Sequence, residues 1–172
     1  DALLLPPSWS DLGDVHYLLG TDDLGRDILS RIILGCSLTF GSSLLVVAVS
    51  LIFGILIGSI AGMSSGVKSS ILNHLFDALL SIPSLLIAII IVAILGPGLL
   101  NSMWAISLAL APQFIHNIHN LVHEEFQKEY VLAAKLDGAG SLNILINSVL
   151  PNILDRIVLH TTLALSIAVL DI

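Results

Sequence analysis

Long stretches without charged side chains dominate the hydrophobic pattern of this chain. Residues 32–67 contain no Asp, Glu, Lys or Arg, and neither do residues 78–123. A helix that crosses a bilayer needs about 20 apolar residues, because each residue advances the helix by about 1.5 Å and the hydrocarbon core is about 30 Å thick. The first stretch has room for one such helix and the second for two. We therefore predict three complete spans, at about 37–63, 78–95 and 102–122.

Prolines and glycines mark where these spans begin, turn and bend. Pro83 lies near the start of the second span, where proline is tolerated, and Gly96-Pro97-Gly98 predicts the turn that follows it. Pro112 lies well inside the third span, where we expect a kink. A fourth span begins near Val158. The uncharged run 157–170 is too short to cross a bilayer, so we expect the chain to be a fragment of a longer protein.

One face of the first span carries only small residues. They recur at every fourth position, at Ser50, Gly54, Gly58 and Gly62. Such a face lets another helix approach closely in lipid, where packing replaces the hydrophobic effect. We expect it to pack within the chain; a contact with a second subunit is the alternative.

The region before the first span is more polar. Residues 1–20 are predicted to form a loop, and Thr21 is placed to cap a helix with Asp22 and Asp23 in its first turn. Apolar residues at helical spacing then predict an amphipathic helix at the membrane interface. We therefore divide the chain into an external loop with an interfacial helix, residues 1–36, and a transmembrane domain, residues 37–172.

Composition supports an all-α, polytopic transmembrane helical bundle. Of the 172 residues, 56% are hydrophobic and 11% are charged, whereas a soluble domain carries about a quarter charged residues. The formal net charge of −7 argues against nucleic acid as a partner, because phosphate binding needs clustered Lys or Arg. The single cysteine, Cys36, excludes an internal disulfide.

The placement of basic residues predicts the orientation. Four of them fall on one side of the predicted topology and two on the other. The four are Lys68, Lys128, Lys135 and Arg156, and the two are Arg26 and Arg31. Because cytoplasmic segments carry an excess of Lys and Arg, we predict that residues 124–152 are cytoplasmic and that residues 1–36 are external.

Two motifs suggest catalytic or metal chemistry at first and then fail. Residues 62–70 look like a phosphate loop, but Val67 separates Gly66 from Lys68, and the pattern needs Gly-Lys adjacent. Residues 123–127 resemble a zinc-protease helix, but Gln127 stands where the second histidine must be. We therefore predict neither ATP binding by a phosphate loop nor catalysis.

Three histidines could still hold a metal. His116, His119 and His123 are spaced to share one helical face. Ligands on successive turns of one straight helix rarely converge to a tetrahedron, so we favour a polar helix end that lines a wet cavity or touches the next loop. A histidine-based metalloenzyme stays open as a lesser alternative.

The polar segment 124–152 stands out between such apolar spans. Good helix formers over residues 128–136 predict a helix that Gly138 can end in a left-handed turn. Ala133 and Ala134 would present a surface that a partner can approach closely. Ser141 can cap a second short helix before Pro151 closes the unit. The apolar positions of that second helix are Leu142, Leu145, Ile146 and Val149. We interpret this helix–glycine–helix knob as a docking element rather than a plain connection.

The same residues resemble the EAA loop of permease subunits in binding-protein-dependent ATP-binding-cassette importers. The resemblance rests on Ala133-Ala134, Gly138 and Leu150-Pro151-Asn152, with Glu129-Tyr130-Val131 similar to the peptide-permease version. Leu132, Asp137 and Gly140 depart from the family pattern. The resemblance implies that the coupling to an ATPase runs through Glu129, Tyr130, Ala133, Ala134, Gly138, Leu150 and Pro151.

A second match points to the same group. Leu19 to Asp27, LGTDDLGRD, resembles the segment before the second span of dipeptide, oligopeptide and nickel permeases. The stretches 4–10, 72–89 and 128–145 are more similar still to permeases of the Sap type, named for sensitivity to antimicrobial peptides. The resemblance covers nearly the whole chain.

This resemblance implies a multi-pass permease of the bacterial inner membrane that is not itself an enzyme and needs no cofactor. Its implied partners are ATP-binding-cassette subunits, a second permease subunit and a periplasmic substrate-binding protein. Peptides, including antimicrobial or other cationic solutes, are the implied cargo, and a nickel or dipeptide permease is the neighbouring alternative. A self-contained channel or secondary carrier is the rival class, but such proteins usually need ionisable groups at membrane depth, and the three complete spans carry no Asp, Glu, Lys or Arg.

Overall fold

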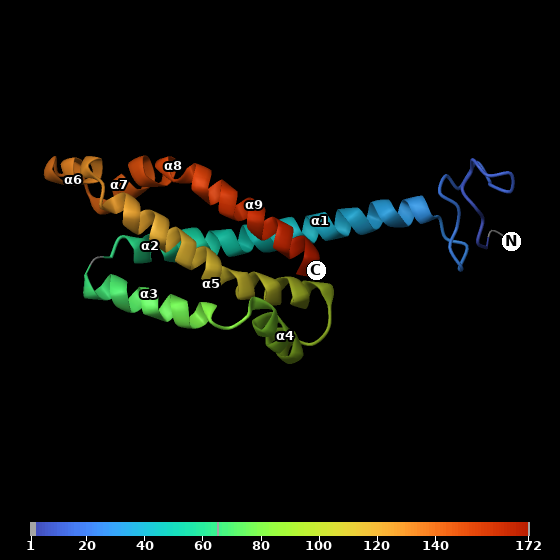
Figure 1. The fold of residues 1–172 in the computed structure, drawn as a ribbon, viewed down its shortest axis with the longest axis horizontal. Coiled ribbons are helices and arrows are strands. Elements are labelled where there is room, and N and C mark those ends of the chain that lie inside the picture. The colour runs from blue at the N-terminus through green and yellow to red at the C-terminus, as the bar shows by residue number, and fades with distance from the viewer. Residues whose placement is uncertain (1–2, 65, 172) are drawn as a thin grey trace. The chain divides into compact units, whose positions relative to one another are not determined.

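The computed structural model describes residues 3–64 and 66–171, which form helices and loops without a strand. The all-α prediction is therefore confirmed. The chain divides into two compact units, Asp1–Ser42 and Ser43–Ile172. Figure 1 shows the course of the helices.

In the N-terminal unit, the loop before residue 28 is closed by acidic side chains. The Asp22 carboxylate accepts hydrogen bonds from the backbone N–H groups of Leu24 and Arg26 and from Nε of Arg26, at 2.9, 2.9 and 2.8 Å. These bonds hold the pKa of Asp22 below its ordinary value of 3.8, and the largest contribution comes from the backbone N–H of Arg26. Asp22 is thus a loop residue here.

The first helix starts later than predicted. The helix α1 spans Ile28–Phe53, and Asp27 accepts bonds from the N–H groups of Leu29 and Ser30 at 3.3 and 3.1 Å. The expected cap at Thr21 is wrong, because Thr21 pairs with Asp27 in an isolated bridge. Gly25, at φ +73°, cannot continue a right-handed helix through this region.

The first predicted span lies inside one long apolar helix. After α1 come the π-helical turn η1, Gly54–Gly58, and α2, Ser59–Gly62. Together they make a helix of 35 residues, Ile28–Gly62, with a mean hydropathy of 2.8 in its most apolar window. That length and composition are sufficient to cross a membrane.

The second predicted span is a bent pair of helices. Helix α3, Val67–Leu80, and helix α4, Ser84–Leu95, meet at 74°. The segment between the first two predicted spans, for which no helix was predicted, is therefore mostly helical. Pro83 explains the break: it disfavours helical backbone at Ile82, and its own ψ of 129° is extended. Pro83 precedes a helix rather than lying inside one.

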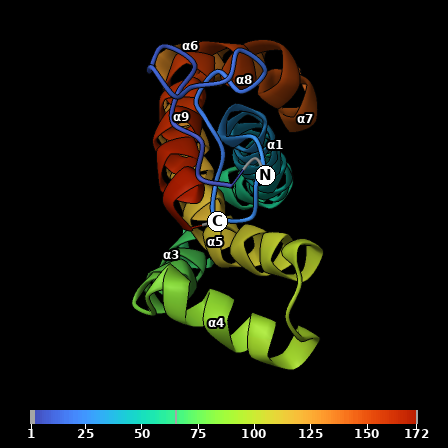
Figure 2. The same ribbon diagram turned by 90° about the vertical axis from the view of Figure 1, so that its right-hand side faces the viewer.

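Helix α5, Leu99–Phe126, is the centre of the second unit. It runs without a break through Pro112 and contacts η1, α2, α3, α4 and α9. Figures 1 and 2 show α3 and α4 on one side of it and α9 on the other. By length and composition the candidate spans in the described residues are Ile28–Gly62 and two bent helix pairs, so α5 is not among them. Its polar residues are compatible with a helix that other helices surround.

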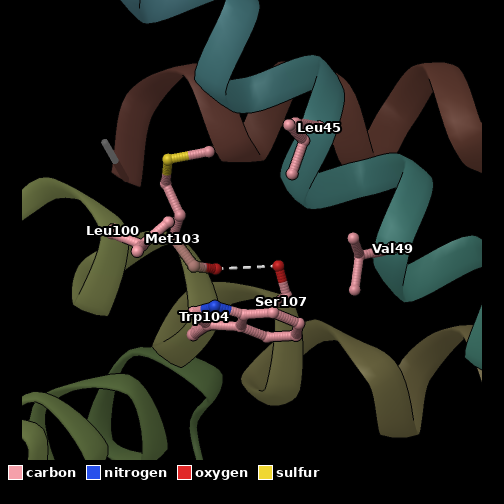
Figure 3. A pocket seen from close by; sticks show the side chains of 6 residues that line it. All are labelled: Leu45, Val49, Leu100, Met103, Trp104 and Ser107. Atoms are coloured by element: carbon pink, nitrogen blue, oxygen red, sulfur yellow. Dashed lines mark hydrogen bonds between the residues drawn. The ribbon is translucent and has the colours of Figure 1, made fainter.

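The small-residue face packs against α5. A Cβ added to Gly54, Gly58 or Gly62 would lie 2.6, 2.7 and 2.7 Å from the nearest atoms of that helix. Two helices can approach this closely only when one of them lacks side chains at the contact. Beside this contact, Ser50 donates a hydrogen bond of 2.9 Å to the carbonyl of Ser107. The expected packing within the chain is confirmed. Figure 3 shows the cavity next to it, where Ser107 bonds the carbonyl of Met103.

The chain then forms the polar hairpin and returns along α5. Four short elements and one longer helix follow one another, and the longer helix meets residues 141–152 at 64°. They are α6 Glu129–Leu136, α7 Ser141–Ile144, η2 Leu145–Val149, α8 Leu150–Asn152 and α9 Leu154–Asp171. Figure 1 shows α6, α7 and α8 gathered at the C-terminal end of α5.

Candidate functional site: the polar hairpin after α5

The predicted helix of the hairpin and its glycine stop are both present. The N–H of Ala139 bonds the carbonyl of Ala134 at 3.0 Å, and the N–H of Gly138 bonds that of Lys135 at 3.1 Å. This pair of bonds is the Schellman arrangement, which requires a left-handed residue after the helix. Gly138 supplies it at φ +88°.

An apolar cluster joins the inner face of the hairpin to α5. Val131, Val149 and Ile153 are each 0% exposed and belong to one cluster with α5. Ala134 packs against this cluster, so only Ala133 of the predicted alanine pair faces outward. Ala134 is therefore half-buried, and its contribution to a docking surface stays a prediction.

The second short helix differs from its prediction in two ways. Ser141 is its first residue, the cap position belongs to Gly140, and no side-chain cap bond forms. Ile144, Leu145 and Val149 are buried, whereas Leu142 and Ile146 are exposed. The π-helical turn η2 adds one residue to the turn and rotates the face that continues into α8.

The outer face of α6 is apolar at two positions. Leu132 is 60% exposed and Leu136 is 82% exposed, and their i, i+4 spacing puts both on one face. Glu129 and Ala133 are exposed on the same short helix, and Lys135 lies over the Phe126 ring at 5.1 Å. An apolar pair rimmed by polar groups is typical of a protein–protein contact.

A buried acid ties α6 to α5. Glu125, which is 3% exposed, accepts a hydrogen bond of 3.0 Å from the hydroxyl of Tyr130 and lies 2.7 Å from Nζ of Lys128. The hydroxyl also bonds Asn152, on α8. Burial, with Glu125 adding to it, raises the pKa of Tyr130 above 10.0. We call Glu125, Lys128, Tyr130 and Asn152 the clasp.

The remaining predicted residues have these positions. Leu150 begins α8 and packs against the apolar cluster, while Pro151 is exposed in the first turn of the same helix. Glu129 lies in the first turn of α6, where a negative charge is favourable. An ion pair of 3.4 Å between Glu124 and Arg156 adds a link from α5 to α9.

The three histidines of α5 engage each other and a neighbouring ring. His119 and His123 stack with their centroids 5.8 Å apart, and Phe76 lies edge-on to His119 at 5.6 Å. His116 shares a hydrogen bond of 3.0 Å with Asn120. Within residues 3–64 and 66–171, no three side chains of His, Cys, Asp or Glu have the geometry to hold a metal.

Sequence reasoning missed three residues of this site. Glu125 was considered only as part of a failed zinc motif and Leu136 only as a helix former, while Leu132 was considered a helix former and a departure from the family pattern. A signal existed for the leucines, because two apolar residues four apart on a short polar helix need a partner surface. Nothing in the sequence marks Glu125 as buried.

Comparison with known proteins gives consistent matches. Residues 54–172 match the family model described as "Binding-protein-dependent transport system inner membrane component". The chain is 52% identical over 169 residues to the peptide transport system permease protein SapC of Escherichia coli O6:H1, covering 98% of this chain and 57% of that protein. It is 47% identical over 169 residues to SapC of Haemophilus influenzae, at the same coverage. It is 44% identical over 171 residues to the di/tripeptide transport system permease protein DppC of Pseudomonas aeruginosa, covering 99% and 56%. The chain thus spans less than two thirds of each of these relatives.

Proposed function

This chain belongs to the family of binding-protein-dependent transport system inner membrane components, and from that membership we propose that it is part of a peptide permease driven by a separate ATPase. The permease is a multi-pass protein of the bacterial inner membrane. A second permease subunit and a periplasmic substrate-binding protein complete the transporter. The names of the relatives, peptide and di/tripeptide permeases, support peptides as cargo.

The observation that carries this proposal is the exposed apolar pair of α6 above a rigid base. Leu132 and Leu136 face outward, while Val131 is fully buried beneath them. A short helix that is held from behind and is apolar in front fits a groove on a partner protein. We assign that groove to the ATP-binding subunit on the cytoplasmic side, so that ATP-driven movement of the subunit pushes on α6.

The clasp connects α6 to the helices of the transmembrane domain, so it can transmit this movement to them. Tyr130 on α6 bonds both Glu125 at the end of α5 and Asn152 on α8. A displacement of α6 would therefore shift α5, the helix around which the second unit is packed. Coupling of this kind needs a connected set of packed elements rather than a loose loop.

The test uses the full-length protein together with its ATP-binding subunits. Leu132→Asp/Leu136→Asp should abolish co-purification of the ATP-binding subunits and ATP-dependent peptide uptake, because charge replaces the apolar face. The matched control, Leu132→Met/Leu136→Met, keeps that face and should keep both activities. Normal uptake by the aspartate variant would reject the proposed docking face.

Sidedness is tested separately. In a Cys36→Ser background, Ala133→Cys should react with a membrane-impermeant maleimide in inside-out vesicles and stay unreactive in intact spheroplasts. The opposite pattern would place α6 outside and remove it from any cytoplasmic ATPase.

A dipeptide permease is the second candidate, favoured by the 44% identity to DppC. A competition experiment decides between the two. Uptake of a labelled pentapeptide that excess dialanine inhibits strongly would favour the dipeptide class, and insensitivity to dialanine would favour longer peptides.

A further inference from the structure

Two cavities flank α5 at the same two carboxamide side chains. An open cavity of about 320 Å³ lies against α4 and the end of α3, and a much smaller one of about 50 Å³ lies against α9. Gln113 and Asn117 line both of them. Since these residues are four apart on one helix, their side chains lie on the same face, between the two cavities.

The neighbouring elements add polar groups to this place. Ser84 at the start of α4 lines the larger cavity, and His160 of α9 lines the smaller one. The cavity in Figure 3 is different, because four of its six lining residues are Leu45, Val49, Leu100 and Met103. The cavities beside Gln113 and Asn117 therefore have a more polar lining than this one.

Both carboxamides are available to a ligand. Within the described residues no hydrogen bond joins Gln113 or Asn117 to another protein group. Gln113 is exposed and Asn117 is half-buried, and both line the larger cavity. Polar side chains that line an open cavity of a membrane protein are typical of a wet cavity or a substrate path.

We propose that Gln113 and Asn117 bind the main chain of a transported peptide. This inference rests on the proposed permease function. Each carboxamide offers one acceptor oxygen and an NH2 donor, which matches the N–H and C=O that every peptide residue repeats. Recognition of the main chain does not depend on sequence, so many peptides can pass by the same two contacts.

The residues that line the two cavities also indicate which feature of a peptide is not recognised at this site. No Asp, Glu, Lys or Arg lines either of these two cavities. Leu79, Ile87 and Ile167 supply apolar walls that accept side chains without selecting them. The charge of a cationic peptide is therefore not recognised at this site, and any preference for cations arises elsewhere in the transporter.

The experiment measures uptake into proteoliposomes that hold the complete transporter and its binding protein. Tri-alanine and penta-alanine are compared with their N-methylated forms, in which main-chain N–H donors are removed. Gln113→Leu/Asn117→Leu should raise the KM for tri-alanine about tenfold, as expected for the loss of one to two hydrogen bonds. It should also erase the preference for the unmethylated peptide. Because the binding protein is the same throughout, a changed preference arises in the permease.

Two further variants control the measurement. Thr162→Val removes a hydroxyl that bonds the carbonyl of Val158 within α9 and lines neither of the two cavities; it should leave KM and preference unchanged. Gln113→Glu/Asn117→Asp keeps the shape and the acceptor oxygens but loses the NH2 donors when ionised, so it should raise KM while keeping the preference for the unmethylated peptide. Assembly with the partner subunits and basal ATP hydrolysis should be normal in Thr162→Val.

The outcomes separate this inference from the proposed function. An unchanged KM and an unchanged preference in the leucine variant would overturn the binding site while leaving the permease intact. Loss of the second permease subunit from the purified complex would show that the carboxamides form a subunit contact, which would also overturn it. Failure of the unaltered transporter to take up either peptide with ATP would reject both proposals.

Discussion

The hydroxyl of Tyr130 lies 3.0 Å from Oε1 of Glu125, across the turn that separates α6 from α5. The acid is 3% exposed, and its only nearby cation is Lys128 at 2.7 Å among the ion pairs of the described residues. A buried carboxylate is tolerated when it is paired and hydrogen-bonded. The clasp therefore fixes the direction of α6 through a group that would be unfavourable alone.

Removal of Lys128 alone should lower the stability of the fold more than removal of Lys128 together with Glu125. Lys128→Met leaves the Glu125 carboxylate buried with one donor, which costs about 1–3 kcal/mol. Glu125→Leu/Lys128→Met removes both charges and should be closer to the unaltered protein. Thermal unfolding of the full-length protein in detergent measures this as a larger fall in Tm for the single variant. Additive effects of the two substitutions would show that the groups are not coupled.

The pH dependence of the clasp follows from Tyr130. Burial raises the pKa of this side chain above 10.0, so the protonated form is favoured by folding. The stabilisation is complete below pH 10.0 and is lost as the pH rises through the folded-state pKa. In a Tyr17→Phe background, absorbance at the tyrosinate wavelength should show Tyr130 titrating above that value, and Tyr130→Phe should flatten the alkaline loss of Tm. Titration of Tyr130 below pH 10 would contradict its hydrogen bond to Glu125.

The sequence was sufficient to predict which segments are apolar and where the hairpin turns. Spacing alone placed the small residues of the first span on one face, and the structure packs Gly54, Gly58 and Gly62 against α5. The left-handed position of Gly138 was also predicted, because few other residues adopt that conformation. Both features depend on the absence of a side chain, which a sequence states directly.

Features that depend on tertiary contacts were not predictable. Thr21 and Asp27 are both good capping residues, and only the loop geometry around Asp22 decides that Asp27 caps the helix. Likewise, the π-helical turn η2 decides which residues of the hairpin are buried, so Ile144 rather than Ile146 faces the cluster. A period of 3.6 residues cannot reveal an inserted residue in a helix turn.

Two glycines of the hairpin provide a matched pair. A Cβ added to Gly138 or to Gly140 would meet no atom within 4 Å, but only Gly138 has a positive φ, of +88°. Gly138→Ala should therefore cost about 1–2 kcal/mol through backbone strain alone, and Gly140→Ala should be tolerated. The ATP consumed per peptide transported should rise in the first variant, since α6 loses its fixed end. Equal behaviour of the two variants would mean that the Schellman turn does not hold the helix.

The contact between the first long helix and α5 should be intolerant of a single methyl group. In Gly58→Ala the new Cβ would lie 2.7 Å from the carbonyl oxygen of Ile115, which is backbone and cannot rotate away. Overpacking of this kind costs about 1–3 kcal/mol. Gly41→Ala is the control, because that glycine lies in α1 and its added Cβ meets no atom within 4 Å. We expect Tm to fall for Gly58→Ala and to stay level or rise for Gly41→Ala, since alanine is the better helix former. A Tm for Gly58→Ala that equals that of the unaltered protein would show that the two helices are farther apart than the structure has them.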